Sequence, residues 1–431
     1  MQKLFVFMID ALCASDIEQM KELNYFNEVI SKGSYVASLE PVYPALTYCC
    51  HTSILTGKYI DGHGIINNED QKRGCKQSKV WFGLKKDVKA PTLLDLAREH
   101  GLTTASICWP VSAGADYTYN WPMIVPYGYH GYDPLQYLDK GNATQNLLDK
   151  YYWKYGRFQK GNDCSLDLLT MAISPDLIRD FGQPDVMLVK MCDLDTMRHT
   201  YGVYSEEAKE QLRKHNEEFG VLLESIKRYG DYDNTNFVIM GDHGQTDIEC
   251  VLNINTLLEK AGFIRKNDKG EIVDLDCFGH STCLTCNIEL KNPEDKEMEK
   301  KVRDYLESLK DDPDIQLDYV YDKKEMEEIY HAEGPYDFII ESKRDISFSD
   351  DTNCPDIFSY KIPGSHKCGA ATHGSSPSRK ETTLFIASGP SVKQGVVLPV
   401  RSMVDEATTM ARMIGFEMND TDGKVMEEIL K

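Results

Sequence analysis

Five short runs of apolar residues stand out along the chain, and longer amphipathic stretches separate them. Each run is rich in β-branched or large apolar side chains and has the length of a buried strand. The runs are Leu4–Ile9, Thr103–Cys108, Val186–Met191, Asn236–Met240 and Thr383–Ala387.

The stretches between these runs show helical periodicity. Residues Asp16–Ser31 form one amphipathic stretch and Ser205–Arg228 another. Strands that alternate with helices predict an α/β fold whose mainly parallel sheet is covered by helices on both faces. Ligands of such folds bind beyond the carboxyl ends of the strands. In the second stretch, four apolar residues share one helical face: Leu212, Phe219, Leu223 and Ile226.

The pattern of apolar and charged residues changes between about 250 and 370. The segment "KNPEDKEMEKKVRDYLESLKDD" predicts a charged helix with Pro293 near its start. Apolar runs at Leu284–Leu290 and Tyr336–Ile340 flank this helix and predict strands. We therefore expect a small α+β subdomain, inserted before the last strand of the main sheet.

This pattern predicts three segments. Residues 1–249 form the first part of a catalytic α/β core, 250–370 the inserted subdomain, and 371–431 the last strand and closing helix of the core. The stretch 117–158 is rich in Tyr and Trp and poor in periodicity. We expect it to be a long, loop-like cap.

Composition restricts the class of protein. The 431 residues are 41% hydrophobic and 27% charged, as in a soluble globular protein, and carry a formal net charge of −21. Such a charge argues against a nucleic-acid polymer or an anionic membrane as the main partner. No run reaches transmembrane length and no signal peptide precedes the first strand, so we expect a cytoplasmic protein. The 13 cysteines fit a reducing compartment.

Acidic and histidine residues gather at the ends of the predicted strands. Asp10 ends the first run, and "MCDLDTMRHTYG" after the third run places Asp195 and His199 one helical turn apart. The adjacent Asp242 and His243 follow the fourth run, and a glycine comes after them. The fifth run is preceded by one more imidazole, His373.

Each of these residues also has a structural explanation, such as a helix cap or a turn. Together, however, they supply three carboxylates and three imidazoles at the edge of the sheet where a ligand binds. Mixed oxygen and nitrogen ligands suit two borderline metal ions, zinc above all.

The stretch "YPALTYCCHTSILTG" offers a nucleophile for such a site. Thr47 begins an apolar, helix-like run that Gly57 closes, so its hydroxyl would lie where helix N–H groups and a metal stabilise an alkoxide. Cys49 and Cys50 lack a C-x-P-x-R context, and a thiolate facing two zinc ions would be held as a ligand. The structural alternative for Thr47 is that its hydroxyl caps the helix, a role that is compatible with that of a nucleophile.

These motifs resemble the nucleotide pyrophosphatase/phosphodiesterase family of the alkaline phosphatase superfamily. The family's T-F-P-N-H followed by an apolar helix and T-G corresponds to Thr47–His51 and Thr56–Gly57. Its HGI-x-NN corresponds to His63–Asn68, and its FFWPGS to "SICWPVS", which contains Trp109. Cys49-Cys50 replaces the family's Pro-Asn, from which we expect altered specificity with the chemistry kept. The resemblance covers residues 1–125, 185–250 and 370–395.

The resemblance implies an alkaline-phosphatase-like fold and a residue for each role. Asn68 matches the asparagine that hydrogen-bonds a phosphoryl oxygen, and Tyr48 the aromatic residue that packs on a nucleobase or other leaving portion. Asp193 competes with Asp195 for the metal, but only Asp195 has the D-x-x-x-H spacing. One zinc ion would be held by Asp195, His199 and His373, and the other by Asp10, Thr47, Asp242 and His243.

The implied reaction is hydrolysis of a phosphodiester or pyrophosphate bond in a nucleotide or related small molecule. Zinc-bound Thr47 attacks phosphorus, and water then hydrolyses the phosphothreonine. Phosphonoacetate hydrolysis, phosphomonoester hydrolysis and non-catalytic metal or nucleotide binding are the alternatives. Asn68, in place of an arginine, favours diesters over monoesters. The sequence makes no prediction of the oligomeric state.

Overall fold

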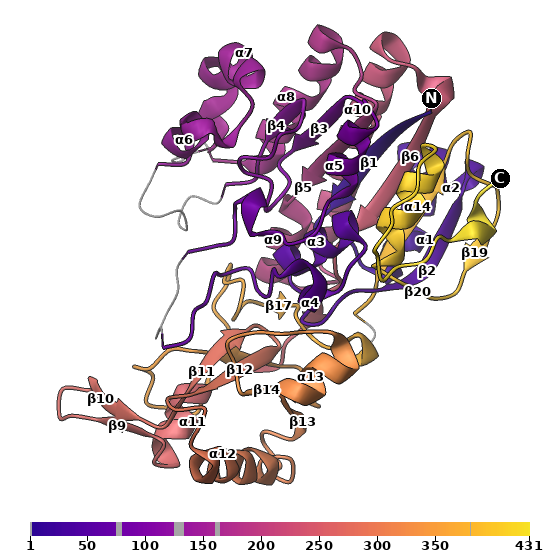
Figure 1. Cartoon of the computed structure of the whole chain (residues 1–431). Helices are drawn as coiled ribbons and strands as arrows, with labels where there is room; N and C mark the ends of the chain where they lie inside the picture. Colours follow the sequence, from indigo (N-terminus) through magenta and orange to yellow (C-terminus); the bar gives the residue numbers. More distant parts are fainter. Residues whose placement is uncertain (1, 75–79, 125–132, 160–163, 380) are drawn as a thin grey trace.

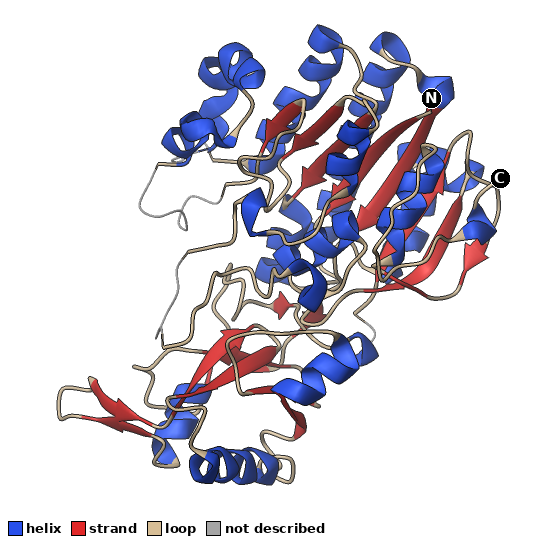
Figure 2. Ribbon diagram, viewed as in Figure 1, coloured by secondary structure: helices blue, strands red, loops and turns tan. Residues whose placement is uncertain are grey.

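The computed structural model describes residues 2–74, 80–124, 133–159, 164–379 and 381–431. A large sheet with helices on both faces forms one part of the molecule, and a smaller part with its own sheet lies beneath one edge of it (Figures 1 and 2). Both chain termini lie in the large part (Figure 1).

The described residues form a nine-stranded central sheet in the order β19-β2-β18-β6-β1-β5-β3-β4, with β20 beside β2. All pairs of neighbouring strands are parallel except those of β18, which runs antiparallel to β6 and β2. The mainly parallel α/β sheet predicted from the sequence is confirmed. The predicted strands are β1 (Lys3–Ile9), β3 (Thr104–Ile107), β5 (Val186–Met191), β6 (Thr235–Gly241) and β18 (Thr383–Ser388).

Four strands of this sheet were not predicted. Their sequences are short, or mix polar residues with apolar ones, so periodicity alone does not single them out. They are β2 (Ser34–Glu40), β4 (Tyr119–Trp121), β19 (Val397–Leu398) and β20 (Arg401–Ser402).

The direction of β18 matters for the site. Phe385 of β18 pairs with Met240 near the end of β6, so β18 begins at the edge of the sheet where β6 ends. Residues that precede Thr383 therefore meet residues that follow β1, β5 and β6. The antiparallel strand brings a late segment of the chain to the edge where parallel sheets bind their ligands.

Helices bury both faces of the sheet. In β1, Leu4, Val6 and Met8 belong to one hydrophobic core, while Phe5, Phe7 and Ile9 belong to the other. This alternation is the two-residue period of a strand that is covered on both sides. The first core includes residues of α3 (Thr47–Thr56), α5 (Leu93–Glu99) and α14 (Asp405–Met413), and the second residues of α2 (Asn24–Lys32), α8 (Leu166–Phe181) and α10 (Glu206–Tyr229).

The two predicted amphipathic helices are present. Ser205 caps α10, because its hydroxyl accepts a hydrogen bond from the N–H of Ala208. The stretch Asp16–Ser31 is divided between α1 (Ile17–Glu22) and α2 by Leu23, whose backbone is extended. Among the described residues, no helix combines the length and apolarity needed to cross a bilayer.

The smaller part contains a four-stranded antiparallel sheet in the order β11-β12-β14-β13. The predicted strands and charged helix appear as β12, β14 and α12, and Val302 and Leu306 of α12 join a separate hydrophobic core. The boundaries 1–249, 250–370 and 371–431 remain our proposal. The elements are β11 (Cys277–Thr282), β12 (Thr285–Leu290), β13 (Leu317–Asp322), β14 (Phe338–Ser342), α11 (Ile254–Lys260), α12 (Lys296–Ser308) and α13 (Lys323–Tyr330).

Several short elements complete the fold outside the two main sheets. A three-stranded sheet has the order β15-β8-β16, β17 pairs with β7, and β9 pairs with β10. Helix α4 (Ile60–His63) follows α3 in the large part. The strands are β7 (Thr246–Asp247), β8 (Cys250–Asn253), β9 (Ile264–Lys266), β10 (Ile272–Leu275), β15 (Ile346–Ser349), β16 (Phe358–Ser359) and β17 (Ala371–Thr372).

The Tyr-rich stretch 117–158 is more regular than expected. Apart from residues 125–132, which lie outside the described residues, it contains β4 and the helices α6 (Pro134–Tyr137) and α7 (Gln145–Tyr155). Leu147, Leu148 and Tyr151 form the buried face of α7. The expectation of loop structure was wrong for α6 and α7, because aromatic side chains on both faces of α7 obscure the apolar period, while the role of the stretch as a cap stays a prediction.

Candidate active site

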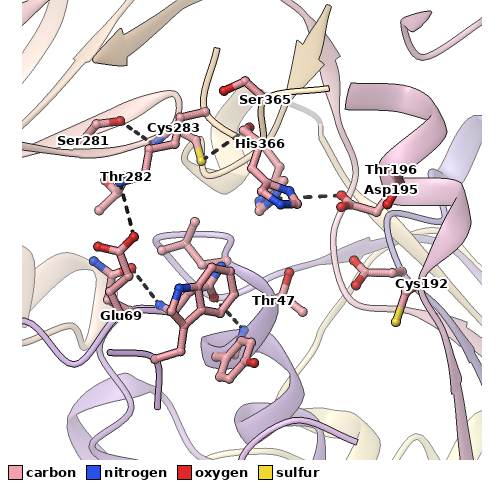
Figure 3. Close-up of a pocket in the computed structure, with 18 of the residues that line it drawn as sticks. Thr47, Glu69, Cys192, Asp195, Thr196, Ser281, Thr282, Cys283, Ser365 and His366 are labelled. Carbon is pink, nitrogen blue, oxygen red and sulfur yellow. Dashed lines mark hydrogen bonds and ion pairs between the residues drawn. The ribbon is translucent and has the colours of Figure 1, made fainter. Parts of the chain in front are cut away.

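A cavity of about 800 Å³ opens where the edge of the central sheet faces the smaller part (Figure 3). Two walls enclose it. The core wall includes Asp10, Thr47, Tyr48, Asn68, Glu69, Trp81, Cys192, Asp195 and His373. The insertion wall is made by Ser281, Thr282, Cys283, Ser349, Asp350, Ser365, His366, Lys367 and Cys368.

The first group of possible metal ligands combines one carboxylate with two imidazoles. Asp195 and His199 lie one turn apart on α9 (Asp193–Tyr201), and His373 follows β17. The Oδ1 atom of Asp195 lies 3.2 Å from Nε2 of His199 and 4.0 Å from Nε2 of His373. One ligand atom from each of the three residues lies within 4.8 Å of the others. We call these residues cluster 1.

The second group combines two carboxylates with one imidazole. Asp10 follows β1, and Asp242 and His243 follow β6. Nε2 of His243 lies 3.3 Å from Oδ2 of Asp242 and 3.5 Å from Oδ1 of Asp10. We call these residues cluster 2. The rings of His243 and His373 stack with centroids 3.8 Å apart, so the two clusters are neighbours.

Backbone carbonyls fix the orientation of all three imidazoles. Nδ1 of His199 lies 2.8 Å from the carbonyl oxygen of Ala371, and Nδ1 of His373 lies 2.8 Å from that of Ala45. Nδ1 of His243 lies 3.1 Å from the carbonyl oxygen of Gly244. A carbonyl can only accept, so each Nδ1 carries a proton, and in the neutral imidazole Nε2 then presents its lone pair to the clusters. Metal-binding histidines are held in this way.

Several buried polar atoms in the clusters have no hydrogen-bond partner within the described part of the chain. They include Oδ1 of Asp10, Nε2 of His199 and Oδ2 of Asp242. Leaving such atoms unpaired in a protein interior is costly. A divalent cation between them would remove that cost, so these residues fit a metal site.

Like charges also accumulate in cluster 2. Burial and the neighbouring Asp242 raise the pKa of Asp10 well above its usual range, and Lys190 only partly opposes this. In cluster 1, burial opposes ionisation of Asp195, but His199 and His373 outweigh it and hold the pKa of that carboxyl low. Cluster 2 therefore has the stronger need for positive charge.

Thr47 lies beside cluster 2. Its Oγ1 atom is 3.2 Å from Nε2 of His243, and the side chain faces the cavity (Figure 3). The helix cap is Leu46, and Thr47 is the first residue inside α3. The alternative that Thr47 caps the helix is therefore wrong. Cys49 and Cys50 are 0% exposed in the hydrophobic core, and burial raises the pKa of both thiols.

The amide of Asn68 has a fixed orientation. Its Oδ1 atom accepts a hydrogen bond of 2.9 Å from the N–H of Tyr48. The NH₂ group is consequently the part of the amide that is left to donate to a ligand. Asn68 lines the cavity beside Thr47.

The aromatic surface of the cavity differs from the expectation for Tyr48. Tyr48 lines the cavity but is 0% exposed, and Trp81 packs edge-on against its ring with centroids 5.2 Å apart. Trp81 is partly exposed. The aromatic side chain that can pack on a bound molecule is therefore Trp81. The sequence carried no motif around Trp81 that would have indicated this.

Two further side chains in the core reach the ligand clusters and were not predicted. His51 lies one turn after Thr47, with Nδ1 2.7 Å from the carbonyl oxygen of Thr47 and 3.3 Å from Oδ2 of Asp242. Lys190 lies within β5 and contacts Asp10. A lysine inside an apolar run, "VMLVKM", was the available signal.

The insertion wall adds a charged group that no motif marks. Nζ of Lys367 lies 3.5 Å from Oε1 of Glu69 and 3.6 Å from Oδ2 of Asp350. Glu69 belongs to the core wall and Asp350 to the insertion wall, so the contact with Glu69 crosses the cavity from one wall to the other. Lys367 lies far from any motif in sequence, and only the fold brings it to the cavity.

The sequence as a whole matches a known family. The family model for type I phosphodiesterase/nucleotide pyrophosphatase matches residues 4–376. Ectonucleotide pyrophosphatase/phosphodiesterase family member 7 of Rattus norvegicus is 23% identical over 428 residues, which cover 96% of this chain and 84% of the rat protein. Venom phosphodiesterase 2 of Crotalus adamanteus is 22% identical over 264 residues, which cover 57% of this chain and 27% of the venom protein.

Solved structures show the same fold. Human ectonucleotide pyrophosphatase/phosphodiesterase 5 superposes with a TM-score of 0.69 at 16% identity, and the match covers 100% of both chains. An inactive threonine-to-alanine variant of the murine protein, in complex with AMP, gives a TM-score of 0.69 at 15% identity over 100% of both chains. With the family model matched across most of its length, the chain belongs to the type I phosphodiesterase/nucleotide pyrophosphatase family of phosphodiester hydrolases.

Proposed function

We propose that the protein hydrolyses a small phosphodiester or pyrophosphate, such as a nucleotide, with Thr47 as its nucleophile. The observation that carries this proposal is the position of the Thr47 hydroxyl, 3.2 Å from His243 in cluster 2 and open to the cavity. The murine relative that was solved with AMP is inactive as a threonine-to-alanine variant, which supports a threonine in this role.

We further propose that two zinc ions complete the site. Asp195, His199 and His373 would hold one ion, and Asp10, Asp242, His243 and the Thr47 hydroxyl the other. The three Nε2 lone pairs and the unpartnered carboxylate oxygens support this assignment. Imidazole-rich ligand sets favour zinc over magnesium. When bound, the ions supply Lewis acidity that stabilises negative charge on oxygen during phosphoryl transfer.

The protein's own groups direct the displacement. Oγ1 of Thr47 attacks phosphorus in line with the leaving oxygen, which yields an ester between Thr47 and the phosphoryl group. Water then hydrolyses this ester and restores the hydroxyl. Because Thr47 is the first residue of α3, the phosphorus that it attacks would lie at the N-terminus of this helix, where the helix dipole stabilises additional negative charge.

Asn68 supports diesters as the preferred substrates. Because its Oδ1 is held by the N–H of Tyr48, its NH₂ group can donate to one non-bridging oxygen. A monoester dianion carries a second charge, which a neutral amide stabilises poorly in comparison with an arginine. Trp81 offers a surface on which the second substituent of a diester can pack.

The test is a comparison of kcat/KM for p-nitrophenyl thymidine monophosphate and p-nitrophenyl phosphate in the presence of zinc. We expect the diester to be hydrolysed faster. A preference for p-nitrophenyl phosphate would favour a phosphomonoesterase, and turnover of phosphonoacetate alone would favour a phosphonoacetate hydrolase. Binding without turnover of any of these compounds would favour a non-catalytic protein.

We also propose a cytoplasmic location and small molecules as the partners, with neither nucleic-acid polymers nor membranes bound. The net charge of −21 and the 13 cysteines support this proposal. Fractionation of cells that express the complete natural gene tests it. Recovery of the protein outside the cytosolic fraction would contradict it.

A further inference from the structure

One lysine is completely buried at the centre of the molecule. Lys190 is 0% exposed and lies in β5, where it pairs with Met8 of β1. Its Nζ atom is 2.5 Å from Oδ2 of Asp10 and 3.2 Å from Sγ of Cys192. A lysine is rarely buried to this extent, because taking an ammonium group out of water is expensive.

The contact with Lys190 divides the two oxygens of Asp10 between two tasks. Oδ2 accepts the hydrogen bond from Lys190, while Oδ1 lies 3.5 Å from Nε2 of His243 and has no hydrogen-bond partner in the described part of the chain. The lysine therefore fixes the rotation of the carboxylate. Only Oδ1 is left to face the other two residues of cluster 2.

Lys190 also changes the charge of cluster 2. Cluster 1 contains one carboxylate, Asp195, whereas cluster 2 contains two, Asp10 and Asp242. An imidazole that ligates a metal is neutral, so with metal bound the three histidines add no charge to either cluster. With the ammonium group of Lys190 included, each cluster carries a net charge of one negative unit.

We propose that Lys190 is a positioning residue. It leaves one oxygen of Asp10 facing the other residues of cluster 2, and its ammonium group cancels the charge of the Asp10 carboxylate. This inference rests on the proposed function. Two carboxylates without a compensating cation would neutralise most of the charge of a metal ion in cluster 2. With Lys190 present, the ion keeps more of its positive charge. The hydroxyl of Thr47, which shares this cluster, is consequently a better nucleophile, and the metal is held less tightly.

The test is Lys190→Met, a substitution of similar length that removes the charge. We expect zinc titration against a chelator to show two equivalents per chain, one of which binds about tenfold more tightly than in the wild type. We expect kcat for the diester to fall about tenfold. Loss of a neutral hydrogen-bond partner would instead weaken metal binding about 10- to 100-fold, so the direction of the change separates the charge from a purely structural effect.

Three variants serve as controls. Lys190→Arg keeps the charge and should bind zinc with an affinity close to that of the wild type. Lys190→Gln keeps a donor without the charge, should bind one zinc equivalent more tightly, and takes the place of Lys190→Met if that variant does not fold. Lys3→Met removes another lysine of the same sheet. Lys3 lies away from the clusters, with its Nζ atom 2.7 Å from Oδ1 of Asp185, and its loss should change neither zinc affinity nor kcat.

The outcomes separate this inference from the proposed function. If the active wild type binds fewer than two zinc ions, the proposed metal set is wrong. If it binds two, but Lys190→Met and Lys190→Gln bind both equivalents as the wild type does or more weakly, the role of Lys190 is overturned and the proposed function stands.

Discussion

The two walls of the cavity differ in what they offer a bound molecule. The core wall presents Thr47 together with Asp10, Asp195 and His373 of the two clusters. The insertion wall presents hydroxyls, thiols and the ion pairs of Lys367. We propose that the core wall carries the reacting groups, together with Asn68 and Trp81, and that the insertion wall serves recognition alone.

This difference separates two effects that substitutions can have. We expect a change to the reacting groups of the core wall to remove interactions that form in the transition state and so to lower kcat. A change in the insertion wall removes contacts to the unreactive part of the substrate, and alters KM or the choice of substrate. Each prediction below tests one side of this comparison.

The largest effect is expected for Thr47→Ala. Without the hydroxyl no covalent ester can form, so kcat for the diester should fall by roughly 10,000-fold or more while the protein stays folded and binds metal. Cys50→Ala is the control in the same helix and should keep substantial activity, because Cys50 is buried in the core. An active Thr47→Ala variant together with an inactive Cys50→Ala variant would reverse the assignment of the nucleophile.

Metal removal should also abolish activity. Dialysis against a chelator should leave a folded protein without turnover, and added zinc should restore the rate better than magnesium does, because half of the six cluster residues are imidazoles. Initial rates after each addition measure this. Full activity in the chelated protein would show that the clusters are structural.

A smaller loss is expected for Asn68→Ala. The variant lacks the amide that we propose as the donor to the phosphoryl oxygen, so kcat/KM for the diester should fall about 10- to 100-fold. The value of kcat/KM for the monoester should fall less, because a neutral amide stabilises the monoester dianion poorly in the wild type. Unchanged diester activity would remove Asn68 from the site.

Sequence patterns predicted the core wall far better than the insertion wall. Asp10, Asp195 and Asp242 follow apolar strands, and parallel strands end at one edge of a sheet, so their meeting could be inferred. No such rule places Lys367 beside Glu69, because that contact depends on how the insertion docks on the core. The sequence motif pointed to Tyr48 as the aromatic contact, but Trp81 packs against its ring, and that packing is a tertiary effect.

Lys367→Met tests the insertion wall. Lys367 is the only lysine or arginine among the described residues that line the cavity. Its loss should raise KM several-fold for NAD or a UDP-sugar, whose leaving part carries a second phosphate, and leave p-nitrophenyl thymidine monophosphate nearly unchanged. Steady-state kinetics with both substrates decides this. An equal change for the two substrates would give Lys367 no part in recognition.

The smallest effect concerns the junction between insertion and core. Glu341 of β14 is buried and accepts a hydrogen bond from the N–H of Ser376, three residues after His373. The hydroxyl of Tyr43, in the loop before Thr47, also donates to it at 3.4 Å. Burial raises the pKa of Glu341 from 4.5 to about 7.

The raised pKa fixes the sign of the pH dependence. The contribution of Glu341 to stability is complete below about pH 4.5 and is lost as the pH rises through about 7. Glu341→Gln is neutral throughout, so its Tm relative to the wild type should increase from pH 5 to pH 8. Glu297→Gln, on an exposed face of α12, should show no such trend. A Tm difference that is independent of pH would contradict the role of Glu341.

The most direct test of the account is the zinc content of the active protein, measured by elemental analysis. We predict two zinc ions per chain in the wild type, and one in His199→Ala, which damages cluster 1, or in Asp242→Ala, which damages cluster 2. Fewer than one divalent metal ion per chain in a fully active wild-type preparation would contradict the two-metal site.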